Sequence, residues 1–360
     1  MIRVLVVDDS ALMRRAITAM LESDPELSVV GAVGDGVAAI AQVAALRPDV
    51  VLLDVDMPVL DGLGATEQIM AYYPTPILVF SSAVQHAQTA LSMHLLGAGA
   101  LDVFPKPAND GVVTLAETQR ELIRRVKLLS RVQTVTHLRG RRRGGDDALR
   151  PPAPAAPPVK QTPGSHPASF VPADQIVVIG ASTGGPRVVQ QILSALPADF
   201  APAVVVVQHI AEGFAAGFAE WLAAACVLPV RLAETGQVAA QGNVIVARDD
   251  QHVLIDGSGV ISTSREPPLL QCPSVDVAMQ RAAASFGART IGVLLTGMGR
   301  DGALGLQAIR QAGGATIAQS AASCTVWGMP RAALELGVVD EERAPDEIAA
   351  RLVALARNRR

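Results

Sequence analysis

A serine lies in a glycine-rich turn directly after the pattern of a buried strand. The apolar run from Ile176 to Ile179 leads into the segment Gly180-Ala181-Ser182-Thr183-Gly184-Gly185-Pro186. The glycines permit a tight turn, and proline suits the first turn of a helix. Ser182 is therefore predicted at the carboxyl end of a strand, facing a helix N-terminus, where α/β sheets place their chemistry. This turn alone is compatible with a nucleophile or with a phosphate cradle.

A histidine and an aspartate follow two further predicted strands. His209 comes directly after the run Val204-Val205-Val206-Val207-Gln208, and Asp301 lies in a glycine-rich loop after the strand pattern at 291–295. A hydroxyl, an imidazole and a carboxylate are the groups that acyl transfer needs: the serine attacks, the histidine removes its proton and the aspartate fixes the imidazole tautomer. Backbone N–H groups near Met298 are candidates for binding the oxyanion.

Each of these residues also has a structural explanation. Asp301 alone fits the N-cap of a helix over 303–310. A phosphate-binding loop is disfavoured, because the turn lacks the lysine of a P-loop and no acidic residue for a ribose follows the second strand. A histidine after a strand is usually a core or capping residue, and we expect this of the remaining histidines: His86, His94, His137, His166 and His252. The pattern favours a hydrolase and leaves these alternatives open.

Polar residues also follow strands predicted in the first 125 residues: Asp8 and Asp9, Asp54, Ser81, and Lys106. Carboxyl ends of neighbouring parallel strands lie side by side, so the three carboxylates should cluster and repel one another. A divalent cation relieves that repulsion, and Mg²⁺ prefers hard oxygen ligands. A hydroxyl and an ammonium beside such a carboxylate suit a phosphoryl group carried on it. The spacing therefore predicts a phosphoacceptor site that binds Mg²⁺.

Alternating strand and helix patterns divide the chain into two α/β regions. The first has strands at 4–7, 29–33, 50–53, 77–80 and 101–104 and a last helix at 115–129; the second has strands at 176–179, 203–207, 244–247, 253–255, 260–262, 290–295 and 315–318. We predict a doubly wound parallel sheet in each. An arginine run at 139–143 and a proline run at 151–158 indicate a Pro/Arg-rich linker. The predicted division is 1–125, a helical extension and linker over 126–173, and 174–360.

Composition narrows the class of protein. The chain has 360 residues, half of them apolar, and a net charge of −4, which does not favour nucleic acid or an anionic membrane as a partner. A transcription factor is further disfavoured because the second region has no helix-turn-helix and no basic face. The three cysteines fit neither a disulfide framework nor a zinc site. With no signal peptide and no apolar run of 18 residues, we expect a soluble cytoplasmic protein without membrane insertion.

In the first region, five segments match a known pattern: Val6-Val7-Asp8-Asp9-Ser10, Leu53-Asp54-Val55-Asp56-Met57-Pro58, Asp61-Gly62, Ser81, and Lys106-Pro107. In these the region resembles the receiver domain of two-component response regulators. The resemblance implies a flavodoxin-like fold and phosphorylation of Asp54 by a histidine kinase. It implies Mg²⁺ held by Asp9, Asp54 and the backbone carbonyl of Asp56, with Asp8 helping through water. It further implies Ser81 and Lys106 as switch residues. Val103 departs from the family, which usually has an aromatic switch residue there.

In the second region, the Ser182 turn is joined by Gln208-His209, Pro273-Ser274-Val275-Asp276, the segment 294–303, and Gly328-Met329-Pro330. In these the region resembles the catalytic domain of chemotaxis protein-glutamate methylesterases, the CheB family. The resemblance implies a Rossmann-like fold, Ser182, His209 and Asp301 as the triad, and Thr183 with the Met298 backbone at the oxyanion site. The chain departs from the family at Ser320-Ala321 and at Gln241-Gly242, away from the triad.

Together the two resemblances imply a phosphorylation-regulated hydrolase for chemotactic adaptation. Its substrates would be glutamate methyl esters and glutamines of chemoreceptors, and a chemotaxis histidine kinase would be the phosphodonor. The unphosphorylated receiver is expected to cover the Ser182 cleft, and the linker to let it move away. The rival hypothesis is a phosphorylation-switched binding module that holds a nucleotide or a receptor without turnover.

Overall fold

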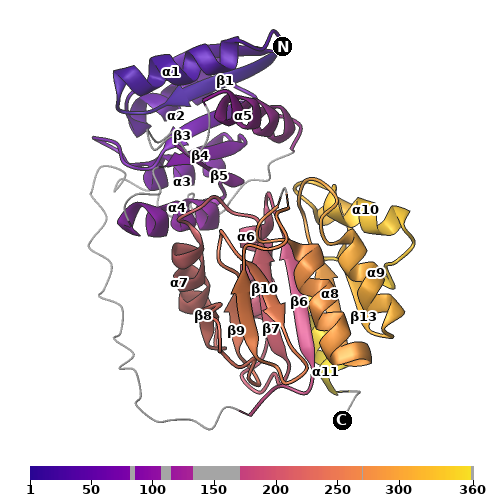
Figure 1. Ribbon diagram of the computed structural model, residues 1–360. Coiled ribbons are helices and arrows are strands. Elements are labelled where there is room, and N and C mark those ends of the chain that lie inside the picture. Colours follow the sequence, from indigo (N-terminus) through magenta and orange to yellow (C-terminus); the bar gives the residue numbers. More distant parts are fainter. Residues whose placement is uncertain (82–85, 107–114, 133–170, 270, 358–360) are drawn as a thin grey trace.

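The computed structural model describes residues 1–81, 86–106, 115–132, 171–269 and 271–357, which form two α/β domains, each built on a parallel sheet (Figure 1). The predicted fold class of two parallel-sheet domains is thereby confirmed. The arginine and proline runs at 139–143 and 151–158, with His137 and His166, lie outside the described residues. Among the described helices, none combines the length and the apolar character needed to cross a membrane.

The first sheet has the strand order β2-β1-β3-β4-β5, an order found in doubly wound folds. Ser10, Asp35 and Asp61 each cap the N-terminus of the helix that follows, so polar residues start these helices while β-branched runs form the buried strands. The strands are β1 (Ile2–Val7), β2 (Leu27–Val33), β3 (Val50–Asp54), β4 (Ile77–Ser81) and β5 (Asp102–Pro105). The helices are α1 (Ala11–Glu22), α2 (Gly36–Leu46), α3 (Gly62–Tyr72), α4 (His86–Ala98) and α5 (Leu115–Leu129).

The second sheet has the order β14-β13-β12-β6-β7-β9-β8, with all paired strands parallel. The chain runs from β6 to β7, β8 and β9 on one side and then crosses to β12 on the other side of β6, so the strand order reverses beside β6, where such sheets carry their sites. The strands are β6 (Ile176–Ala181), β7 (Ala203–Gln208), β8 (Val230–Leu232), β9 (Val244–Val246), β12 (Thr290–Leu294), β13 (Ala315–Gln319) and β14 (Glu341–Arg343). The helices are α6 (Gly185–Ser194), α7 (Ala215–Ala225), α8 (Val275–Phe286), α9 (Ala303–Gln311), α10 (Met329–Glu335) and α11 (Pro345–Arg357).

Two sheet strands escaped the sequence pattern, and two predicted strands lie outside the sheet. The edge strands β8 and β14 have three residues each and carry charged side chains, a composition that blunts an exposed edge and hides the apolar signal. The segments β10 (His252–Ile255) and β11 (Ile261–Ser264) form a separate antiparallel hairpin instead of joining the parallel sheet. An apolar pattern predicts a strand but not the strand with which it pairs, so the pairing of β10 with β11 could be read only from the tertiary structure.

The two domains pack directly on each other. Helix α4 lies beside α7 (Figure 1). There Trp221 covers Gly97, and buried apolar side chains of both domains form one continuous cluster. Trp221 itself is only 9% exposed. At the edge of this contact, the backbone N–H of Gly184 donates to the Leu101 carbonyl at 3.1 Å. The start of β5 in the first domain is therefore held against the turn that follows β6 in the second.

Candidate active site

The Ser182 turn joins β6 to α6 as the sequence predicts. Ser182 directly follows β6, Gly184 has a φ of +76°, and α6 begins at Gly185. The Ser182 N–H donates to the Thr296 carbonyl at 3.0 Å. A Cβ atom at Gly297 would lie 2.6 Å from the Ser182 Cβ, so only glycine allows the loop after β12 to approach this closely. The turn and the loop that contains Met298 and Asp301 are thus in contact.

His209 and Asp301 meet at the same edge of the sheet. His209 follows β7, the strand next to β6, and its N–H donates to the Ala181 carbonyl at 2.9 Å. Its side-chain Nε2 lies 2.8 Å from Asp301 Oδ2, and both side chains are mostly buried, with 11% and 13% exposed. Of the contacts expected within the predicted triad, the described residues form this one, and Ser182 follows the neighbouring strand β6. The structure therefore brings the three predicted residues to three adjacent strand ends.

The Asp301 carboxylate lies at the N-terminus of α8. Its Oδ2 also accepts from the Val275 N–H at 2.7 Å, and its Oδ1 accepts from the Asp276 N–H and the Ser274 hydroxyl, both at 2.9 Å. Burial works to raise the pKa of this carboxyl, but the bonds from His209 and the α8 backbone outweigh it and hold the pKa below its ordinary value. An ionised Asp301 can only accept, so Nε2 of His209 carries the proton and Nδ1 offers its lone pair.

The alternative role considered for Asp301, an N-cap of the helix that follows it, is not the one observed. The N-cap of α9 is Gly302, and Asp276 of α8 supplies the missing acceptor through Oδ1, at 2.8 Å from the Gly302 N and 2.7 Å from the Gly305 N. Asp301, which lies just before α9, thus accepts from the N-terminus of α8, and Asp276, which lies in α8, accepts from the N-terminus of α9. Sequence reasoning missed this role of Asp276, because a cap on a helix whose N-cap residue is 26 positions away leaves no local signal.

Asp276 makes the stability of the fold depend on pH. Burial, reinforced by the nearby Asp301, raises the pKa of Asp276 to about 6 against the bonds from Gly305 and Gly302. A raised folded-state pKa means that this stabilising contribution is complete below about pH 4 and is lost as the pH rises through about 6.

We therefore expect Asp276→Asn, which cannot ionise, to abolish this part of the pH dependence. Between pH 4 and pH 7 the wild type should lose stability that the variant keeps. The free energy of unfolding of the variant minus that of the wild type should therefore increase over this range, by at most about 3 kcal/mol. Denaturant titrations of both proteins across this range measure the difference. A difference that stays constant with pH would show that Asp276 does not titrate in this way.

The two residues predicted beside the oxyanion contact the first domain. Thr183 is 2% exposed, and its hydroxyl donates to Asp102 Oδ2 at 3.0 Å, while Met298 Sδ lies 3.3 Å from Arg124 Nη1 of α5. Asp102 is further held by Arg125 of α5 at 2.9 Å. The sequence pattern did not single out Asp102, since an acidic residue at the start of a strand carries no local functional signal.

The predicted acidic cluster assembles at the carboxyl edge of the first sheet. Carboxylate oxygens of Asp8, Asp9 and Asp54 all lie within 4.8 Å of one another. Asp8 and Asp54 are buried and Asp9 is exposed. The Lys106 ammonium bridges the two buried carboxylates, 2.8 Å from Asp8 Oδ2 and 2.7 Å from Asp54 Oδ2. Burial raises the pKa of Asp54 against the pull of this ammonium, which leaves a more basic carboxylate.

The donor set of this cluster fits Mg²⁺ and a phosphoryl group. Three hard carboxylates in one cluster are typical of a Mg²⁺ site. Ser81 Oγ is fully buried next to this cluster at the end of β4, and it has no hydrogen-bond partner among the described residues. Burying a hydroxyl without a hydrogen-bond partner costs free energy. The position of the Ser81 hydroxyl, on the strand beside Asp54, therefore fits a hydrogen-bond donor to a ligand bound at this cluster. Asp56, the predicted carbonyl ligand, lies exposed two residues after the end of β3.

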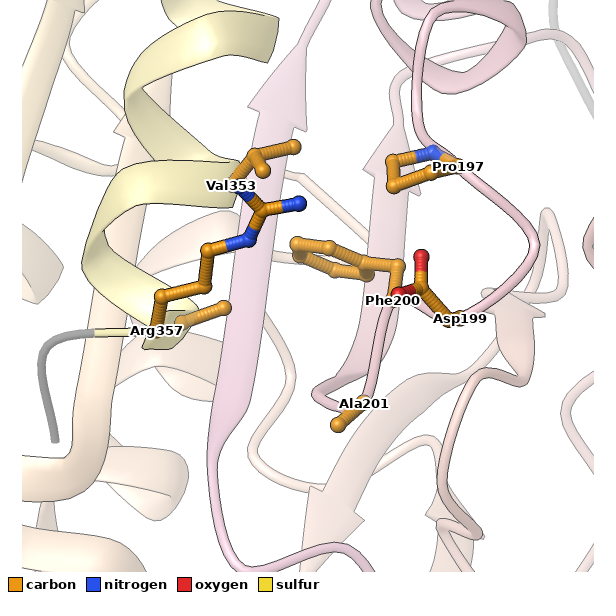
Figure 2. Close-up of a pocket in the computed structure, with 7 residues that line it drawn as sticks. Pro197, Asp199, Phe200, Ala201, Val353 and Arg357 are labelled. Carbon is orange, nitrogen blue, oxygen red and sulfur yellow. The ribbon is translucent and has the colours of Figure 1, made fainter. Parts of the chain in front are cut away.

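A small hollow in the second domain lies away from this chemistry. It has a volume of about 70 Å³ and lies at the amino end of β7, opposite the edge that carries Ser182 and His209. Figure 2 shows the Phe200 ring pointing toward Val353 and Arg357 of α11. Its lining contains no member of the predicted site, so it does not belong to the active site.

Comparison with known proteins identifies a family for each domain. Residues 4–116 match the response regulator receiver domain family, and residues 177–352 match the CheB methylesterase family. A protein-glutamate methylesterase/protein-glutamine glutaminase of Anaeromyxobacter dehalogenans is 46% identical over 98% of both chains. One from Pyrococcus horikoshii is 40% identical over 94% of this chain and 89% of its own. The catalytic domain of Thermotoga maritima CheB methylesterase covers 51% of this chain and all of that structure, with 35% identity and a TM-score of 0.50.

The fold and the two sites define a class of protein, a response regulator whose output domain is a hydrolase. A receiver sheet with an acidic cluster is joined to a second parallel sheet with Ser182, His209 and Asp301 at its carboxyl edge. The relatives match this whole arrangement over nearly the full length of both chains. The chain belongs to the CheB family of protein-glutamate methylesterases, and the resemblance predicted from the sequence is confirmed.

Proposed function

We propose that this enzyme hydrolyses glutamate methyl esters and deamidates glutamines of chemoreceptors, with Ser182, His209 and Asp301 as its triad and phosphorylation of Asp54 as its control. The observation that carries the proposal is the 2.8 Å bond between His209 Nε2 and Asp301 Oδ2 beside the Ser182 turn. That bond leaves Nδ1 as the proton acceptor, as a general base for serine requires. The methylesterase relatives support the substrate.

The reaction follows from these roles. Ser182 Oγ attacks the ester carbonyl while His209 Nδ1 takes the hydroxyl proton, and backbone N–H groups near Met298, with Thr183, stabilise the oxyanion. Collapse of the tetrahedral intermediate expels methanol, which receives the proton from His209. Water then attacks the acyl-enzyme with His209 again as base, which releases glutamate and restores Ser182. With glutamine as substrate, ammonia replaces methanol as the leaving group.

Control begins at the acidic cluster of the receiver. We propose that Asp54 accepts the phosphoryl group from a histidine kinase, and that Lys106 and Ser81 turn toward its oxygens. Asp8, Asp9, Asp54 and the Asp56 carbonyl would hold Mg²⁺, which when bound offsets negative charge at the phosphoryl group. The unpaired Ser81 hydroxyl and the bridging Lys106 ammonium support this assignment.

The domain contact supports inhibition by the unphosphorylated receiver. Asp102 holds the Thr183 hydroxyl, and the Leu101 carbonyl holds the Gly184 N–H, so the receiver touches the turn directly after the nucleophile. Asp102 begins the strand that leads to Lys106, and Lys106 contacts the phosphoacceptor. Since Val103 stands where the family has an aromatic switch residue, we propose that this chain relays phosphorylation through β5 itself.

The remaining assignments complete the proposal. We propose a flavodoxin-like receiver over 1–125, a helical extension and linker over 126–173, and a Rossmann-like catalytic domain over 174–360. The helix α5 ends at Leu129, so its last four residues, 126–129, lie within the proposed extension. The proposed partners are methyl-accepting chemoreceptors and a chemotaxis histidine kinase, and the reaction takes place in the cytoplasm, where receptors carry their modified helices.

Methanol release from methylated chemoreceptor membranes tests the function directly. The full chain should release methanol, and a small-molecule phosphodonor with Mg²⁺ should raise the rate. A chain that binds the membranes without releasing methanol, with or without the phosphodonor, would instead be a phosphorylation-switched binding module.

We expect Asp102→Ala to raise the basal rate of methanol release by about tenfold or more and to reduce the further gain on phosphorylation. The change removes a hydrogen bond between a carboxylate and Thr183, and such bonds contribute on the order of 1.5–3 kcal/mol. Arg125 keeps Glu121 and the Val103 carbonyl as partners, which preserves the receiver.

The matched control is Asp24→Ala, which removes another carboxylate that pairs with a cation of α5, Lys127. Asp24 has no contact of this kind with Thr183, so its loss should leave basal release unchanged. Equal basal rates for Asp102→Ala and the wild type would contradict inhibition through Thr183.

A further inference from the structure

Ser274 makes two hydrogen bonds through one hydroxyl at the start of α8. As the N-cap it accepts from the Val277 N–H at 3.3 Å, and it donates its proton to Asp301 Oδ1 at 2.9 Å. Its side chain is buried, at 2% exposure. Capping needs only the acceptor, so the donated bond to the triad carboxylate is a feature that helix formation does not require.

The bond from Ser274 completes the fixation of Asp301. Each carboxylate oxygen accepts two hydrogen bonds: Oδ2 from Val275 N–H and His209, and Oδ1 from Asp276 N–H and Ser274. Apart from His209, Ser274 is the side-chain donor in this set. Without it Oδ1 would keep one backbone bond, and the carboxylate could turn about that bond and draw Oδ2 away from Nε2.

Ser274 is itself held from behind by a buried histidine. Its N–H donates to Nδ1 of His252 at 3.0 Å, and Nε2 of His252 lies 2.9 Å from the Pro267 carbonyl. A carbonyl can only accept, so His252 carries its proton on Nε2 and is a fixed acceptor for Ser274. His252 is fully buried, in keeping with the core role expected from the sequence. The support under Asp301 is therefore in place before any substrate binds.

We propose that Ser274 is a positioning residue of the hydrolytic reaction, whose hydroxyl fixes the Asp301 carboxylate against His209. This inference rests on the triad of the proposed function. It assigns to Ser274 an effect on the chemical step and none on substrate binding, because Ser274 acts through Asp301 and His209.

Three variants of Ser274 separate the donated bond from the cap. Ser274→Ala removes both, Ser274→Gly removes the hydroxyl but leaves a residue that serves well as an N-cap, and Ser274→Thr keeps the hydroxyl. The matched control is Thr316→Val, which removes another fully buried hydroxyl that lies 2.8 Å from a carboxylate, that of Asp340, near the opposite end of the sheet.

We expect Ser274→Ala and Ser274→Gly to lower kcat for methanol release by about 10- to 100-fold with KM unchanged, since a lost bond to a charged group has an effect of this size. Ser274→Thr should restore most of kcat, and Thr316→Val should keep it. The proton that His209 Nε2 shares with Asp301 should give a downfield NMR resonance in the wild type, in Ser274→Thr and in Thr316→Val. That resonance should broaden or vanish in Ser274→Ala and Ser274→Gly.

Ser182→Ala, assayed alongside, distinguishes an error in the triad from an error in the positioning role of Ser274. If Ser182→Ala keeps its activity, the triad itself is wrong. If Ser182→Ala is inactive while folded Ser274→Gly retains full kcat and the NMR signal, the triad stands and the positioning role of Ser274 is overturned. Should Ser274→Ala unfold, Ser274→Gly decides by the same two measurements.

Discussion

Ser182→Ala should lower methanol release from methylated receptor membranes by a factor on the order of 10⁶ in kcat. The variant lacks the oxygen that forms the acyl-enzyme, so what remains is the catalysis that the oxyanion site and binding provide for attack by water. Ser182 lies at a turn whose shape depends on glycines at positions 184 and 297, and alanine fits in place of serine without disturbing either. Methanol release in the presence of a phosphodonor measures the loss, and co-sedimentation with the membranes measures binding, which should survive.

The control for this experiment is Ser194→Ala at the far end of α6. Ser194 is exposed, and its hydroxyl donates to the Gln190 carbonyl within the same helix. Its loss should leave methanol release at the level of the wild type. A Ser182→Ala variant that retains a tenth or more of the wild-type rate would exclude Ser182 as the nucleophile.

Asp301→Asn should lower kcat by a factor on the order of 10⁴. Asparagine offers one oxygen where the site presents two donors to each oxygen of the carboxylate, so its amide N–H₂ must face N–H or O–H groups in either orientation. When the amide nitrogen faces His209, Nε2 loses its acceptor and the imidazole shifts to the tautomer that cannot take a proton from Ser182. The kcat and KM of methanol release report the change, with KM expected to stay near its wild-type value.

Asp340→Asn is the matched control for this substitution. The Asp340 carboxylate also accepts from a backbone N–H and a hydroxyl, both of Thr316, but it lies at the amino end of β13, away from the triad. This variant should lose stability while keeping kcat. Similar losses of kcat in the two Asn variants would assign the effect of Asp301→Asn to damage of the fold.

Two sets of hydrogen bonds surround the Ser182 turn, one at the helix N-termini of the second domain and one at the contact with the receiver. The α8 N-terminus holds Asp301 through two backbone N–H groups and Ser274, and Asp276 returns the interaction to the N-terminus of α9. On the other side of Ser182, Thr183 and Gly184 are held by Asp102 and Leu101 at the start of β5 in the receiver. In the proposed function, Ser182 thus lies between the support of its general base, His209, and a contact that movement of the receiver would release.

Local sequence patterns were sufficient for the secondary structure around the site. Apolar runs of four or five residues predicted β1, β3, β4, β6 and β7, because strands buried on both faces must be apolar throughout. Polar residues directly after these runs predicted Ser182, His209 and Asp54 at the carboxyl edges. Parallel strands bring their carboxyl ends together, so candidates for both sites followed from position along the chain alone.

Contacts between distant segments could be read only from the tertiary structure. The sequence does not indicate that Asp301 caps α8 in place of its own helix, that Ser274 donates to Asp301, or that Asp102 reaches Thr183 across the domain contact. These bonds join residues 27 and 81 positions apart in the cases of Ser274 and Asp102. A hydrogen bond depends on the distance and direction between two groups in space. The residues next to a side chain in the sequence do not indicate which distant group folding brings within that distance.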